Sequence, residues 1–188
     1  MPREIEAKFP LENRRRIVAK LEELGAERLY PETFEDNIIL DRRGELKTRG
    51  ALLRVRQFGR YTITTFKGPV SFSGGIKSRE EVQTGIESFD RAIALFDALG
   101  YRPTFRYQKL REVWRLKGSE VVLDRTPIGD YMEIEGAEDQ ISVIAADLDL
   151  EMADAIRASY VDLYRRERRV RADLPENMVF SPEELPGR

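Results

Sequence analysis

The sequence predicts an α+β protein with a large sheet of eight antiparallel strands covered by about four helices, and we hypothesise that the sheet closes into an eight-stranded antiparallel β-barrel (a tunnel) with a charged interior. Three observations favour this fold class. Apolar and polar residues alternate over eight segments, which is the period of a half-buried strand. Short turn sequences such as Arg42-Arg43-Gly44 and Phe58-Gly59-Arg60 join most of them, and short joins favour antiparallel neighbours. Charged residues occupy alternate positions of several strands, so one face of the sheet is ionic.

The strands are expected at residues 3–9, 34–41, 51–58, 60–67, 77–87, 104–116, 119–125 and 130–136. Residues 70–78 are expected to connect two of them. Apolar residues at helical spacing predict helices at residues 11–24, 90–99, 138–148 and 152–164. Gly25 and Gly100 are placed to end the first two helices, and Ser88 is a candidate N-cap. Residues 1–164 would form one domain, and residues 165–188 a basic and then proline-containing tail.

The composition excludes several kinds of chemistry. The 188 residues include no histidine and no cysteine, so disulfides, thiolate nucleophiles, Cys/His zinc sites and Ser-His-Asp triads cannot form. Catalysis would need carboxylates, lysine, arginine, tyrosine, hydroxyls or a hard metal ion. The net charge of −2 argues against a general nucleic-acid binder. No apolar run approaches the roughly 18 residues of a membrane span, so we expect a cytoplasmic protein without a membrane partner.

Charges of the same sign recur two residues apart along several predicted strands. The pairs are Glu4 and Glu6, Arg54 and Arg56, Lys109 and Arg111, and Glu133 and Glu135. The ordinary explanation for any one strand is a polar face turned to solvent. Like charges on one face repel, however, so several such pairs together suggest an external counter-charge.

Each type of pair suits a particular ligand. Paired carboxylates suit a hard divalent cation, and paired arginine and lysine suit phosphate oxygens. A cavity with both would suit a metal-chelated polyphosphate. Because alternate residues of every strand point into a closed barrel, we hypothesise that the charged face is the interior and that the helices cover an apolar outside.

Seven motifs in order resemble those of the CYTH superfamily, the triphosphate tunnel enzymes, and most closely proteins labelled class IV adenylyl cyclases, which are related to thiamine triphosphatases. They are Glu4-Ile-Glu6-Ala-Lys8, Leu53-Arg54-Val55-Arg56, Thr65-Phe66-Lys67-Gly68-Pro69, Arg79-Glu80-Glu81, Lys109-Leu-Arg111, Asp124 followed by Gly129-Asp-Tyr-Met-Glu133-Ile-Glu135, and Ser159-Tyr160-Val-Asp-Leu163. A lone Glu-x-Glu-x-Lys would be weak evidence, but the ordered set indicates the family.

The resemblance implies a site inside the tunnel. The metal ligands would be Glu4, Glu6, Glu81, Asp124, Glu133 and Glu135, and the cofactor Mg²⁺ or Mn²⁺. The triphosphate would be held by Lys8, Arg54, Arg56, Lys67, Arg79, Lys109 and Arg111. Glu4, Glu6 and Lys8 would be the catalytic residues. The substrate would be a small triphosphate (ATP, inorganic triphosphate or thiamine triphosphate), and the protein a monomer or homodimer.

The resemblance leaves the reaction open. Attack by a ribose 3′-hydroxyl would make cyclic AMP and pyrophosphate, whereas attack by water would make the protein a triphosphatase. Ile39 occupies a position where many family members have a tyrosine thought to activate water, which favours the cyclase. A non-catalytic polyphosphate sensor is an alternative, and an RNA-binding helix at Arg165 to Arg171 is disfavoured because acids interrupt that run.

Overall fold

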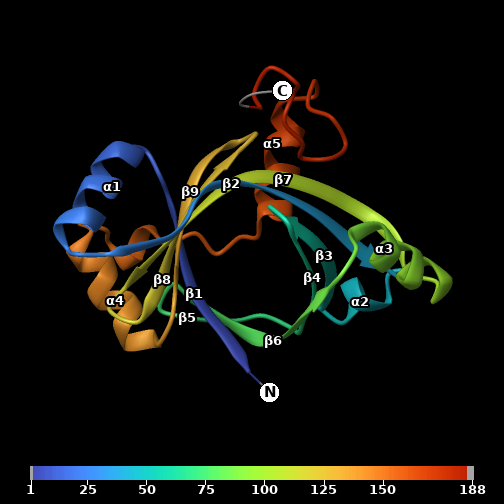
Figure 1. Ribbon diagram of the computed structural model, residues 1–188, viewed down its shortest axis with the longest axis horizontal. Helices are drawn as coiled ribbons and strands as arrows, with labels where there is room; N and C mark the ends of the chain where they lie inside the picture. The colour runs from blue at the N-terminus through green and yellow to red at the C-terminus, as the bar shows by residue number, and fades with distance from the viewer. Residues whose placement is uncertain (1, 186–188) are drawn as a thin grey trace.

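Eight antiparallel strands close into a barrel in this computed structural model, which describes residues 2–185 (Figure 1). The fold class is therefore confirmed. The strands are β1 (Arg3–Pro10), β2 (Glu27–Asp41), β3 (Leu52–Phe58), β4 (Tyr61–Lys67), β5 (Ser71–Ser73), β6 (Ile76–Ile86), β7 (Arg102–Leu116), β8 (Ser119–Thr126) and β9 (Gly129–Glu135). Residues 186–188, the end of the predicted tail, lie outside the described residues.

The barrel order is β1-β9-β8-β7-β2-β3-β4-β6, and pairing of β1 with β6 closes it. At this closure Glu4 lies opposite Arg79 and Glu6 lies opposite Lys77. The short strand β5 pairs with β6 within the segment that was expected to be only a connection. β2 begins at Glu27 and not near residue 34, because it continues past Pro31 with register shifts that break the alternation in the sequence.

The described residues contain five α-helices and one short 3₁₀ turn. The helices are α1 (Arg14–Glu23), α2 (Glu45–Thr48), α3 (Phe89–Ala98), α4 (Glu138–Asp147) and α5 (Tyr160–Val170), and the turn is Met152–Asp154. The short helix α2, between β2 and β3, was not predicted. In the part of the chain that the structure describes, no helix is both long and apolar enough to cross a bilayer.

The predicted helix at 152–164 is wrong in its bounds. After the 3₁₀ turn, residues 155–159 are irregular, and the Ile156 N–H donates to the Lys8 carbonyl at 2.7 Å. The helix α5 begins only where Ser159 and Asp162 form a reciprocal capping box. It then runs past residue 164 to Val170. The spacing of apolar residues correctly predicted a helix in the second half of the segment. The first half is instead a 3₁₀ turn and an irregular stretch that is hydrogen-bonded to β1.

Helices cover the outer, apolar face of the barrel, as predicted (Figure 1). α1 and α4 pack over β1, β8 and β9, where Leu21, Met132 and Ile144 are fully buried. α3 covers Leu40 and Val55 of β2 and β3. This arrangement inverts an ordinary barrel, because the apolar core lies outside the sheet and the charged side chains inside.

The chain after α5 returns to the barrel along β7. The Gln108 N–H donates to the Met178 carbonyl at 2.8 Å, and the Met178 N–H donates to the Arg106 carbonyl at 3.1 Å. The Met178 side chain is fully buried beside Phe105 and Tyr107. Part of the predicted tail is therefore packed against the barrel wall.

Candidate functional site

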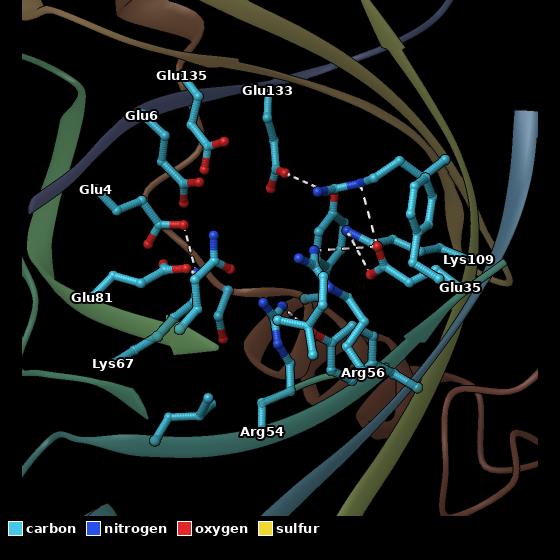
Figure 2. Close-up of a pocket in the computed structure, with 18 of the residues that line it drawn as sticks. Glu4, Glu6, Glu35, Arg54, Arg56, Lys67, Glu81, Lys109, Glu133 and Glu135 are labelled. Carbon is cyan, nitrogen blue, oxygen red and sulfur yellow. Dashed lines mark hydrogen bonds and ion pairs between the residues drawn. The ribbon is translucent and has the colours of Figure 1, made fainter. Parts of the chain in front are cut away.

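The barrel interior holds a cavity of about 580 Å³, a size typical of small-molecule sites (Figure 2). All but one of the predicted site residues line it: Glu4, Glu6, Lys8, Arg54, Arg56, Lys67, Arg79, Glu81, Lys109, Arg111, Glu133 and Glu135. The exception, Asp124, is fully buried and forms ion pairs with two of them. The strand alternation places these side chains inside, because they share inward-facing positions on neighbouring strands.

Three carboxylates gather on one side of the cavity (Figure 2). Glu6 on β1 lies directly opposite Glu135 on β9, and Glu4 is two residues before Glu6. One oxygen from each of the three lies within 4.8 Å of the others. Burial, followed by the charges of Glu6 and Glu4, raises the pKa of Glu135 to about 8. In residues 2–185, no lysine or arginine nitrogen lies within 4.0 Å of Glu135.

This group fits a hard divalent cation. Carboxylate oxygens are the preferred ligands of Mg²⁺ and Mn²⁺, and a cation would neutralise the crowding that raises the Glu135 pKa. The other three carboxylates of the predicted metal set fall outside this group of three, although Glu81 shares Lys67 with Glu4, and each of them forms ion pairs. Glu81 lies 2.6 Å from Lys67, Glu133 lies 3.2 Å from Lys8, and Asp124 binds Lys109 and Arg111. The structure thus brings together Glu4, Glu6 and Glu135, and not all six.

Neighbouring cations keep Glu4 ionised. Its carboxylate lies 2.5 Å from the Lys67 Nζ and 2.8 Å from the Arg79 Nε. Burial alone would raise the Glu4 pKa, but the charges of Lys67, Arg79 and Lys77 outweigh it and hold the pKa far below its usual value. Lys77 forms an ion pair with Glu6. Cations from β4 and β6 therefore neutralise Glu4 and Glu6, whereas within residues 2–185 no lysine or arginine nitrogen lies within 4.0 Å of Glu135.

Arg54 and Arg56 on β3 line the cavity on the side away from the three gathered carboxylates (Figure 2). Arg54 is only 8% exposed, yet among the described residues no carboxylate oxygen lies within 4.0 Å of its guanidinium. It donates instead to the Tyr107 hydroxyl at 3.1 Å. Arg56 has one distant carboxylate, Glu35, at 3.5 Å. The Nε atoms of both arginines lack a hydrogen-bond partner. Buried cations with unused donors are suited to an anionic ligand.

A network of ion pairs fixes the β7 cations beside these arginines. Asp124 accepts two hydrogen bonds from Arg111, at 2.8 and 2.7 Å, and one from Lys109 at 2.8 Å. Arg111 also donates to Glu133 at 2.7 Å. The buried Glu35 lies 3.5 Å from Lys109. Burial would raise the Glu35 pKa, but Lys109 and Arg111 outweigh it and hold the pKa well below its usual value. These cations are therefore positioned before any ligand arrives.

Among the lining residues that were not predicted, four form hydrogen bonds or ion pairs with predicted site residues: Glu35, Lys77, Tyr107 and Tyr160. Lys77 shares the inward face of Arg79, and this alternation could have identified it. Tyr160 donates to Asp124 at 2.7 Å, and the Lys8 Nζ lies 3.7 Å from its ring centroid. Tyr107 lies two residues before Lys109 on the same inward face of β7, so the alternation could have identified it too. The residues two positions from Glu35, Thr33 and Asn37, are uncharged and gave no such signal. Ile39 lines the cavity at the position where the resemblance indicated a tyrosine.

A closed barrel with a charged interior cavity defines a tunnel-type small-molecule site. The sequence model of the CYTH domain family matches residues 2–160, and the chain belongs to this family. A protein of Methanocaldococcus jannaschii named "putative adenylate cyclase" is 25% identical over 175 residues, which cover 85% of this chain and 97% of that protein.

Solved structures share the fold. A "putative adenylate cyclase" of Vibrio parahaemolyticus superimposes with a TM-score of 0.78 at 18% identity, covering 86% of this chain and 97% of that one. A "putative adenylyl cyclase" of Hippeastrum, described as having a dominant triphosphatase activity, superimposes with a TM-score of 0.65 at 17% identity, covering 96% and 99%. At these identities the two structures establish only that the fold is shared.

Proposed function

We propose that this protein is a divalent-metal-dependent enzyme that acts on a triphosphate, with conversion of ATP to cyclic AMP and pyrophosphate as its leading reaction. The observation that carries the proposal is the pairing of two incomplete sites in one cavity. Arg54 is buried and Arg56 is partly buried, and both have unused donors. Glu135 is a partly buried carboxylate with no lysine or arginine nitrogen within 4.0 Å among the described residues. A metal-chelated polyphosphate would complete both.

Glu4, Glu6 and Glu135 would hold Mg²⁺ or Mn²⁺. A bound divalent cation would neutralise charge on phosphate oxygens and polarise the phosphorus toward attack. Arg54 and Arg56 would bind phosphate oxygens through their guanidinium forks, joined by Lys67, Arg79, Lys109 and Arg111 as further donors. The remaining predicted ligands, Glu81, Asp124 and Glu133, would act by holding these cations in place.

The fixed ion pairs support catalysis by positioning. Transfer of a phosphoryl or nucleotidyl group needs alignment and charge stabilisation more than covalent chemistry from the protein. Lys8 illustrates this, because its Nζ lies 3.2 Å from Glu133 and donates to the Ala158 carbonyl at 3.3 Å. A cation held in this way neutralises developing charge without having to reorganise.

Two considerations favour the cyclase as the leading reaction. The curated Methanocaldococcus relative is named an adenylate cyclase and is matched over nearly its whole length. Ile39 has no hydroxyl with which to orient a water, and it lines the cavity where many family members carry a tyrosine.

Hydrolysis of a triphosphate is the second candidate, and a specific observation favours it. Tyr107, on the strand next to Ile39, is 6% exposed and its hydroxyl faces Arg54 inside the cavity. Burial would raise the Tyr107 pKa, but the charges of Arg54 and Lys109 outweigh it and lower the pKa. A phenol in this setting could orient water in place of the missing tyrosine. The Hippeastrum structure indicates that this fold can support a triphosphatase.

Product analysis separates the candidates. The protein is incubated with Mg²⁺ or Mn²⁺ and ATP, inorganic triphosphate or thiamine triphosphate, and the products are resolved by chromatography. We expect cyclic AMP and pyrophosphate from ATP. Orthophosphate release would instead support the triphosphatase. Tight binding without turnover of any of the three would support a non-catalytic polyphosphate sensor.

A further inference from the structure

Aromatic side chains line one end of the cavity. Tyr30, Phe58 and Tyr61, here called the aromatic mouth, project from the start of β2 and from the turn between β3 and β4. The Tyr30 and Phe58 rings meet edge to face, with centroids 5.4 Å apart and planes at 77°. Tyr30 is 42% exposed and Tyr61 is 45% exposed. Large aromatic surfaces are therefore open to the cavity and to solvent, although burial would stabilise them.

The aromatic mouth adjoins the phosphate-binding arginines. Phe58 lies on the same inward face of β3 as Arg56, two residues further along, and opposite Glu35 in the register. Two residues of a strand span about 6.6 Å. A group attached to a phosphate at Arg56 would therefore reach the aromatic rings without leaving the cavity.

The other end of the cavity has a different character. Ile39, Leu52 and Val161 line it with branched aliphatic side chains. The nearby rings of Tyr107 and Tyr160 are buried, and their hydroxyls are engaged by Arg54 and Asp124. Among the described lining residues, exposed aromatic side chains are thus concentrated at the β3–β4 end, where the Arg60 guanidinium lies over the Tyr61 ring at 5.0 Å from its centroid.

We propose that the aromatic mouth binds the planar base of a nucleotide substrate, so that the protein acts on a nucleoside triphosphate and not on inorganic triphosphate. Stacking on aromatic rings is the usual way in which proteins hold a base. Gln83, which is exposed and lines the cavity from β6, offers an amide that can hydrogen-bond to base heteroatoms. This inference rests on the proposed function, because it assumes that the phosphates occupy the arginine side of the tunnel.

Binding of two uncleavable ligands tests the inference. Calorimetry in Mn²⁺ compares an ATP analogue whose bridging oxygens are replaced by methylene groups with the corresponding triphosphate analogue without nucleoside. Wild-type protein should bind the ATP analogue more tightly. Phe58→Ala and Tyr30→Ala should each weaken the ATP analogue about 10-fold and leave the triphosphate analogue within about twofold. Phe72→Ala, an exposed aromatic on β5 that does not line the cavity, serves as the matched control and should change neither.

The outcomes separate this inference from the proposed function. Equal affinity of wild-type protein for both analogues, or the same loss for both analogues in the aromatic variants, would overturn the base site while leaving a triphosphate enzyme intact. Failure of wild-type protein to bind either analogue would overturn the proposed function itself, and the base site with it.

Discussion

Glu6 and Glu135 lie directly opposite each other on the antiparallel strands β1 and β9. Like charges at opposed positions destabilise a sheet, and here both carboxylates face a closed interior. Glu6 forms an ion pair with Lys77, whereas Glu135 depends on protonation for relief. Ionisation of Glu135 would therefore create a charge excess that a divalent cation would neutralise.

The first prediction concerns the pH dependence of stability in metal-free protein. The pKa of Glu135 is raised from 4.5 to about 8 in the folded state. Between pH 4.5 and about pH 8, folding is therefore accompanied by the binding of a proton to Glu135. The contribution of Glu135 to stability is fully present below pH 4.5 and is lost as the pH rises toward 8, with a slope of at most about 1.4 kcal/mol per pH unit.

Denaturant unfolding in EDTA at several values between pH 5 and pH 8 measures this slope. Glu135→Gln, which is neutral at every pH, should flatten it relative to wild type. Glu80→Gln, on the outward face of β6, should retain the wild-type slope. Identical slopes for wild type and Glu135→Gln would contradict the raised pKa of Glu135 beside Glu4 and Glu6.

A second prediction concerns metal-dependent turnover. Glu6→Gln removes one carboxylate of the group while keeping its shape, so cation binding and charge stabilisation both weaken. We expect turnover to fall by at least about 100-fold and the Mn²⁺ concentration for half-maximal activity to rise. Steady-state rates across a Mn²⁺ titration measure both effects. Glu80→Gln again serves as the control, and wild-type metal dependence in Glu6→Gln would remove Glu6 from the site.

Arg54 gives a third prediction. It has unused donors and no carboxylate within 4.0 Å among the described residues, so its loss removes phosphate contacts without leaving a buried acid unpaired. Arg54→Gln should raise KM at least about 10-fold, with a smaller effect on kcat. Arg106→Gln is the matched control, because Arg106 binds Asp36 on the outer face of the barrel. Unchanged KM in Arg54→Gln would contradict the assignment of the phosphates to this side.

The Tyr107 hydroxyl gives a fourth prediction. If it only positions Arg54, Tyr107→Phe should raise KM about 3- to 10-fold and leave kcat and its pH profile unchanged. We expect this result for cyclic AMP formation. A lower kcat for orthophosphate release with an altered pH profile would instead indicate that the phenol takes part in hydrolysis, and it would support the triphosphatase.

The chain after α5 gives a fifth prediction. Met178 is fully buried against β7, so Met178→Ala should lower the free energy of unfolding by about 2–5 kcal/mol. Denaturant unfolding followed by circular dichroism measures it. Val170→Ala, at a residue that is 79% exposed, should have little effect. An unchanged midpoint for Met178→Ala would contradict the packing of Met178 against β7.

The alternation of charges predicted most of the charged residues that line the barrel interior, because it depends only on neighbouring residues of one strand. Arg54 and Arg56 must share a face if β3 is a strand, and barrel closure then turns that face inward. The same rule could not identify Glu35, because β2 is bulged and the neighbours of Glu35 on its face are uncharged. The sequence also could not show which carboxylates meet. Glu6 and Glu135 are joined only by the β1–β9 register.

The helix bounds failed for a similar reason. Apolar spacing over 152–164 favoured a helix, but tertiary contact overrides it, because the Ile156 N–H is used by the Lys8 carbonyl of β1. The capping pair Ser159 and Asp162 was a local signal that could have placed the start of α5 correctly.

The central claim is that one tunnel holds a divalent cation and a triphosphate together. The most direct measurement is the affinity for the uncleavable triphosphate analogue, determined by calorimetry in Mn²⁺ and in EDTA, with wild-type protein and with Glu135→Gln. We expect Mn²⁺ to tighten binding at least about 10-fold in wild type and much less in Glu135→Gln. Equal affinity with and without Mn²⁺ in wild type would contradict the account.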